Sequence, residues 1–253
     1  MGNQYKIPCL IDLPSRRLHK DRIMNSSYRD RDLFGDEVSF LNDIRDSYGE
    51  YSSNILIGGL VSTKGNCYNY TEALAEDEAY TYHQYQIIKL ADSGADFLIA
   101  VTMSSLSESL GISKAMSQTN CEYIISFIVD KDGNLLDGTS IDIAIQTIDS
   151  AVEHPPICYM INCVHPINID HCLKSKKNKT IINRIYGVCG NGSRSPIEDL
   201  ENNLEIQNDS PNIFSKHMIN LYHKYKFRII GGCCGTNSAH LSQIARTLVH
   251  EGL

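Results

Sequence analysis

Several features that define other protein classes are missing from this sequence of 253 residues. No apolar run approaches the roughly 18 residues of a membrane-spanning helix, and the N-terminus lacks a signal-peptide pattern. We therefore expect no membrane partner and a cytoplasmic location. Positive charge is also scarce, with 23 Lys and Arg against 30 Asp and Glu and a net charge of −7. This charge balance argues against a nucleic-acid partner.

Two familiar spacing patterns are absent as well. The nine cysteines are an odd number and lack the regular spacing of a disulfide scaffold, and no CxxC pair occurs among them. Metal ligands or buried apolar cysteines in a reducing compartment fit this usage better. No GxGxxG motif follows the first apolar run, so the signal of a dinucleotide-binding Rossmann fold is missing.

Apolar runs alternate with amphipathic stretches along most of the chain. This alternation predicts βαβ units and a parallel sheet, so the expected fold is an α/β (β/α)8 TIM-type barrel. One unit, the second, is expected to be degraded or missing, because only a helix at 36–48 is predicted between Asp12 and Asn54. No domain boundary is visible, so residues 1–253 are expected to form a single barrel domain. The expected strands are 6–12, 54–60, 96–102, 122–129, 156–162, 180–186 and 227–231, and the expected later helices are 71–93, 105–117, 139–153, 167–175, 211–225 and 238–251.

Three cysteines directly follow predicted strands. Cys163 follows the fifth expected strand, and the adjacent Cys233 and Cys234 follow the last one. The C-terminal ends of barrel strands carry the active sites of this architecture. Adjacent cysteines seldom bond to each other because the ring is strained, whereas three thiolates with an open fourth position suit a catalytic zinc ion. Spacing alone leaves open a second interpretation, in which the pair forms a tight turn and Cys163 is a buried cysteine.

The segment Gly231-Gly232-Cys233-Cys234-Gly235-Thr236, together with Asn162-Cys163, resembles the zinc-dependent homocysteine S-methyltransferase family. The resemblance implies a (β/α)8 barrel that binds Zn²⁺ through Cys163, Cys233 and Cys234. It also implies a transferase that methylates the thiol of homocysteine to give methionine, as in methionine biosynthesis. The small-molecule partners would be a thiol acceptor and a methyl donor, S-methylmethionine or S-adenosylmethionine. Zinc would favour the thiolate form of the acceptor.

Asp12 matches the carboxylate of the family's first-strand motif, which lies near the amino end of the substrate. The resemblance therefore makes Asp12 a substrate-binding candidate, and a strand-end cap is the alternative. The sequence departs from the family pattern nearby, because Leu13-Pro14-Ser15-Arg16-Arg17 replaces small residues and a Thr-Glu pair. A second acid is missing where Val101-Thr102-Met103-Ser104 stands.

These departures leave three hypotheses open. The first is a methyltransferase that acts on homocysteine or a close analogue. The second is a degenerate zinc-binding barrel without activity that serves as a binding or regulatory protein, and the third is a metal-free redox role for the adjacent cysteines. A barrel that lacks one unit would also expose strand edges, and a homo-oligomer is one arrangement that covers them.

Overall fold

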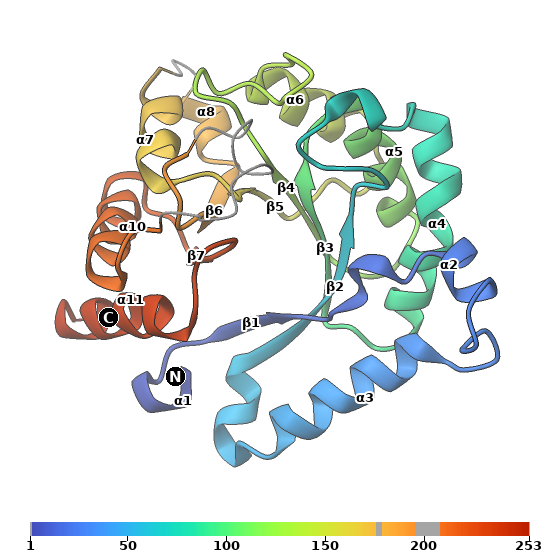
Figure 1. Cartoon of the computed structure of the whole chain (residues 1–253), viewed down its shortest axis with the longest axis horizontal. Coiled ribbons are helices and arrows are strands. Elements are labelled where there is room, and N and C mark those ends of the chain that lie inside the picture. Colours follow the sequence, from blue (N-terminus) through green and yellow to red (C-terminus); the bar gives the residue numbers. More distant parts are fainter. Residues whose placement is uncertain (1, 176–178, 196–207, 253) are drawn as a thin grey trace.

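Seven parallel strands form the centre of the molecule, and helices pack around their outer side (Figure 1). The computed structural model describes residues 2–175, 179–195 and 208–252. The strands neighbour one another in the order in which they occur in the sequence, and each adjacent pair is parallel. They are β1 (Cys9–Asp12), β2 (Ile55–Ser62), β3 (Phe97–Met103), β4 (Tyr123–Phe127), β5 (Cys158–Asn162), β6 (Ile185–Gly190) and β7 (Ile229–Gly232).

The sheet curls into a partial barrel from which one β/α unit is missing. β1 pairs directly with β2, and the described stretch between them contains helices α2 (Lys20–Met24) and α3 (Leu33–Asp46) but no strand. Within the described residues, β1 and β7 are the two edges of the sheet. The expected α/β barrel with a missing second unit is therefore confirmed.

Helices alternate with the later strands, as the sequence pattern predicts. Several begin at side-chain caps, which satisfy backbone N–H groups that have no partner inside the helix. Ser105 accepts from the backbone N–H of Glu108, and Asn237 accepts from that of Ala239. No described helix is long and apolar enough to cross a membrane. The remaining helices are α1 (Gly2–Tyr5), α4 (Glu76–Asp92), α5 (Leu106–Ser117), α6 (Ile141–Ala151), α7 (Pro166–Ser175), α8 (Lys179–Ile182), α10 (Pro211–Tyr225) and α11 (Ser238–His250), with 3-10 turns η1 (Ser15–Arg17), η2 (Gly49–Asn54) and η3 (Tyr70–Glu72).

Apolar side chains fill both sides of the sheet. β4 and β5 are buried along their whole length, as expected for parallel strands covered on both faces. A large cluster lies between the sheet and the helices, and a smaller one, which includes Phe97, Ile124 and Met160, fills the inside of the curl. Near the open edge the inner face is less well covered, since Leu10 and Leu56 are 39% and 46% exposed.

Two predicted starts were wrong by five residues, and the other starts differ by fewer. The helix expected from residue 71 begins at Glu76, because η3 and the extended Ala73 precede it. The strand expected at 180–186 is β6 (Ile185–Gly190), and the β-branched run before it lies in α8 instead. The last part of β6, with Cys189, lies beyond the expected strand end at residue 186. Residues 196–207, between the expected strand at 180–186 and the expected helix at 211–225, lie outside the described residues.

Arg184 fixes the start of β6 through a dense set of contacts. Its guanidinium donates to both carboxylate oxygens of Asp149 at 3.0 and 2.8 Å, and to the carbonyls of Pro156 and Ile157 at 2.9 and 3.2 Å. A lysine keeps the charge but cannot reproduce this planar set of donors.

We expect Arg184→Lys to lower the free energy of unfolding by about 1–3 kcal/mol, because hydrogen bonds of a half-buried charged group are lost. Urea denaturation at neutral pH measures the change. The control is Lys174→Gln, which removes an exposed ammonium paired with the half-buried Asp170 and is expected to cost less than about 1 kcal/mol. Equal losses in the two variants would contradict the role given to Arg184.

Candidate metal centre

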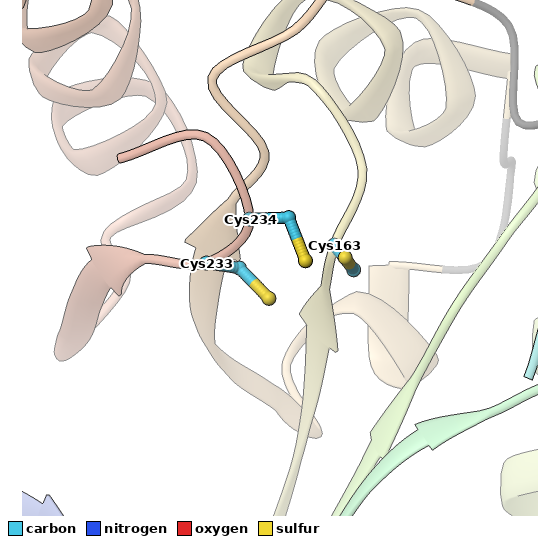
Figure 2. Close-up of side chains that lie close together, drawn as sticks. All are labelled: Cys163, Cys233 and Cys234. Carbon is cyan, nitrogen blue, oxygen red and sulfur yellow. The ribbon is translucent and has the colours of Figure 1, made fainter. Parts of the chain in front are cut away.

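The three cysteines singled out in the sequence lie together at the C-terminal ends of the strands. Cys163 directly follows β5, and Cys233 and Cys234 directly follow β7. Figure 2 shows their side chains close together, and the three Sγ atoms all lie within 4.8 Å of one another. Cys163 is buried, Cys233 is half-buried and Cys234 is exposed, so the group is open on one side.

Asn162 holds the ends of several strands around this group. Its side-chain oxygen accepts from the backbone N–H of Thr102 at 2.9 Å and from the hydroxyl of Ser126 at 2.7 Å. Its amide nitrogen donates to Cys233 Sγ at 3.9 Å. Thr102 and Cys163 both have positive φ, at 55° and 60°. Non-glycine residues in this region cost about 1–3 kcal/mol each, and such strain concentrates at functional sites.

The end of β6 lies between the two cysteine-bearing loops and fixes their separation. The backbone N–H of Cys163 donates to the carbonyl of Cys189 at 3.0 Å, and that of Cys233 donates to the carbonyl of Gly190 at 2.7 Å. Continued strand pairing thus places the two loops in register on either side of β6. The positions of all three sulfurs follow from this pairing.

Two polar residues outside the sequence motifs also reach the sulfurs. The side-chain amide of Asn191 donates to Cys163 Sγ at 3.8 Å, and the hydroxyl of Tyr68 lies 3.2 Å from the same sulfur. Tyr68 belongs to the loop after β2, 95 residues before Cys163. Sequence reasoning missed both residues, and the only signal was that each follows the C-terminal end of a strand.

Hydrogen bonding among the thiols concentrates negative charge on one of them. The hydrogen bonds of Cys163 and Cys233 lower the pKa of Cys234. The same contacts and burial raise the pKa of Cys233. The hydrogen bond with Cys233 lowers the pKa of Cys163, but the bond with Cys234 and burial outweigh it and raise that pKa to about 11. Cys234 is thus favoured as a thiolate, the form of cysteine that binds metals.

Asp12, the other candidate from the sequence, ends β1 and points to the inside of the barrel. A side chain on its partner Gly58 would contact both the Asp12 carboxylate and the Phe97 ring. Solvent reaches Asp12, yet the surrounding protein desolvates it and raises the pKa of its carboxyl to about 6. Among the described contacts this carboxylate has no hydrogen bond or ion pair. It therefore remains able to bind a ligand.

Asp209 ties together the loops around the cysteines, although no local sequence motif points to it. Its carboxylate accepts from Arg194 at 2.8 and 2.9 Å and from His165 Nε2 at 3.2 Å. His240 Nε2 donates to its backbone carbonyl at 3.0 Å. Burial opposes ionisation of Asp209, but the hydrogen bonds from Arg194 and then His165 outweigh it and lower the pKa. The partners come from three separate segments, which explains why no motif links them.

Gly235 is needed for the turn that follows the two adjacent cysteines. Its φ is +73°, and an added Cβ would collide with the side chain of Asn208. Gly94 also has a positive φ, of +92°, but an added Cβ there meets nothing within 4 Å. A substitution at Gly94 therefore measures the free-energy cost of the backbone conformation alone, whereas one at Gly235 adds the cost of the collision.

We expect Gly94→Ala to cost about 1–2 kcal/mol of unfolding free energy from the left-handed conformation alone. Gly235→Ala should cost more, because steric overlap adds to the same term. Urea denaturation of both variants gives the comparison. A smaller loss for Gly235→Ala than for Gly94→Ala would refute this account of the turn.

The raised pKa of Asp12 predicts a specific pH dependence. Its pKa of about 6 lies above the ordinary value of 3.8, so ionisation destabilises the folded state and this cost appears as pH rises from about 4 past 6. Asp12→Asn cannot ionise. Its stability relative to the natural protein should increase over that interval and then level off. Urea midpoints from pH 4 to pH 8 test this, with the exposed Asp30→Asn as control, and a difference that is constant with pH would contradict it.

Comparisons with known proteins agree with the fold. Residues 15–248 match the model of the homocysteine S-methyltransferase family. Homocysteine S-methyltransferase YbgG of Bacillus subtilis (strain 168) is 27% identical over 193 residues. That match covers 74% of this chain and 58% of YbgG, so the chain spans less than two thirds of its curated relative.

Solved structures of the homocysteine methyltransferase MmuM from Escherichia coli have a similar fold. The metallated form has a TM-score of 0.73 at 17% identity, with 94% of this chain and 79% of MmuM covered. The oxidized form has a TM-score of 0.71 at 17% identity, with 98% and 82% covered. At this identity the likeness concerns the fold. The family match over most of the sequence shows that this chain belongs to the homocysteine S-methyltransferase family.

Proposed function

We propose that the chain is a zinc-dependent methyltransferase that methylates the thiol of homocysteine or a close analogue and gives methionine or the matching thioether. The observation that carries this proposal is the convergence of Cys163, Cys233 and Cys234 at the strand ends of a family member. The proposed methyl donor is a sulfonium compound, S-methylmethionine or S-adenosylmethionine. We propose that residues 1–253 act as one barrel domain.

The donor set suits zinc. Three thiols are soft ligands, and three protein ligands leave the fourth tetrahedral position open for a substrate. Zinc–sulfur bonds of about 2.3 Å place tetrahedral sulfurs about 3.8 Å apart, within the 4.8 Å that bounds the present separations. The exposed side of Cys234 leaves a path to the open position. The metallated form of MmuM supports the same proposal.

A bound zinc ion would supply one property, namely a lower pKa for the acceptor thiol, so that it reacts as a thiolate near neutral pH. The chain's own residues hold and orient the participants. Asn162 and Asn191 donate to Cys233 and Cys163, which fixes the directions of these sulfurs. Such outer contacts orient metal ligands and tune them. Asp12, ionised above its pKa of about 6, would accept hydrogen bonds from the acceptor's ammonium group.

The proposal predicts one zinc per chain and methionine formation from homocysteine and S-methylmethionine. Cys233→Ser and Cys234→Ser should each lose zinc and activity, because two thiols hold zinc far less well than three. The control is Cys121→Ser, since Cys121 lies before β4, where its thiol contacts the carbonyl of Ala95. Metal analysis and a methionine assay give the two readouts. Full zinc content in both variants would exclude the ligand assignment, and zinc without methyl transfer from either donor would favour the inactive zinc-binding barrel.

Zinc removal should also lower the stability of the fold. At free zinc of about 100 times its dissociation constant, the zinc-loaded protein should be about 2.7 kcal/mol more stable than the chelated protein, if zinc binds only the folded state. Urea denaturation with and without a chelator measures the difference. Cys163→Ser should show little difference between the two conditions. A stability gain as large in this variant as in the natural protein would mean that zinc binds elsewhere.

A further inference from the structure

Arg16 provides a positive charge at the same end of the barrel as the cysteine group. The proposed chemistry has not used this charge. It lies in η1, four residues after Asp12, and its Nε donates to Ser62 Oγ at 3.2 Å. Ser62 is the last residue of β2, which places the guanidinium at the mouth of the barrel. Within the described residues, no carboxylate lies at ion-pair distance from Arg16.

Buried contacts hold the backbone next to Arg16 in place. The hydroxyl of Ser15 donates to the carbonyl of Leu60 at 2.8 Å and accepts from its N–H at 3.1 Å. The fully buried Gln86 donates to the carbonyl of Ser15 at 2.7 Å. The guanidinium is tethered through Nε to Ser62, and its two terminal nitrogens keep their donors. A fixed cation with free donors loses less entropy on binding than a mobile one.

Three other acids at this end of the barrel are already engaged by the protein. Asp12, which ends β1, differs from them because its carboxylate is unpaired among the described residues. Asp12 and Arg16 are thus a carboxylate and a guanidinium at the mouth that are not neutralised by each other or by other described residues. The engaged acids are Glu108, with the N–H of Lys64 and with His83, Asp137, with the N–H groups of Leu106 and Thr139, and Asp209, with Arg194 and His165.

We propose that Arg16 binds a carboxylate of the acceptor, so that the substrate class is thiols that carry a carboxylate. The planar guanidinium matches a carboxylate with two parallel hydrogen bonds, a geometry that lysine does not offer. The assignment rests on the proposed methyl transfer, since it names the acceptor of that same site. On this assignment the carboxylate of the acceptor is the main group that the protein recognises. Asp12 adds contacts only for acceptors that also carry an ammonium group.

Three thiols separate these contributions. Homocysteine carries both charges, 4-sulfanylbutanoate carries only the carboxylate, and 3-sulfanylpropan-1-amine carries only the ammonium. Calorimetry with zinc-loaded protein measures their binding, and the rate of methyl transfer from S-methylmethionine gives kcat/KM for each. The natural protein is compared with Arg16→Gln and with a variant of its exposed neighbour in the same turn, Arg17→Gln. Zinc content and urea midpoints establish that both variants remain folded and loaded.

We expect Arg16→Gln to weaken binding of the two carboxylate thiols by about ten- to a hundredfold, the range for loss of a charge-assisted hydrogen bond. Binding of the amine thiol should stay unchanged, and Arg17→Gln should leave all three thiols unaffected. Arg16→Lys should restore part of the loss because it restores the charge.

Two results would overturn the assignment while methyl transfer itself remains intact. One is an equal effect of Arg16→Gln and Arg17→Gln on the carboxylate thiols, and the other is an equal loss for the amine thiol in Arg16→Gln. Failure of the natural protein to bind or methylate any of the three thiols would instead reject the proposed function, and with it the role of Arg16.

Discussion

The side chain of Asn162 joins four strand ends around the cysteine group, and the geometry of the site depends on it. Its oxygen takes hydrogen bonds from β3 and β4, and its nitrogen gives one to the sulfur that follows β7. Asn162 is itself the last residue of β5. A carboxamide is suited to this place because it accepts and donates at once. A purely apolar residue would leave the buried N–H of Thr102 without a partner.

The two ends of the barrel differ in the contacts and backbone conformations that they contain. At the end where the strands begin, Arg184 and Asp149 make a regular clamp on β5 and β6. At the other end, Thr102 and Cys163 hold a backbone conformation that is unfavourable for their residue types. Fixed strand pairing and Asn162 keep them there. Lys6 and Lys226, which precede β1 and β7 at the other end, also have positive φ. The strain at Thr102 and Cys163 lies where the thiols must converge, and the rest of the sheet supplies the stability that holds it.

Much of this site follows from the sequence, because a parallel barrel brings all strand ends to one face. That rule needs only the order of strands and helices, so Cys163 could be placed beside the distant Cys233 and Cys234. Contacts between loops obey no such rule. Asp209 and His165 are separated by 44 residues, and Tyr68 reaches Cys163 from a loop without a motif. The predicted start of β6 was also wrong, since tertiary contacts of Arg184 outweighed the strand propensity of the preceding residues.

The missing barrel unit affects the pocket more than the cysteine group. β1 is now an edge strand, and its inner face, with Leu10 and Asp12, is reached by solvent from the open side. The cysteines lie on the opposite half of the sheet, after β5 and β7, where continuous pairing with β6 holds them. A loss between β1 and β2 therefore leaves that geometry intact. It acts instead on the segment that carries Asp12 and Arg16, which have no charged partner among the described residues. Change in this family member is thus concentrated where an acceptor would be recognised, while the group proposed to hold its sulfur is preserved.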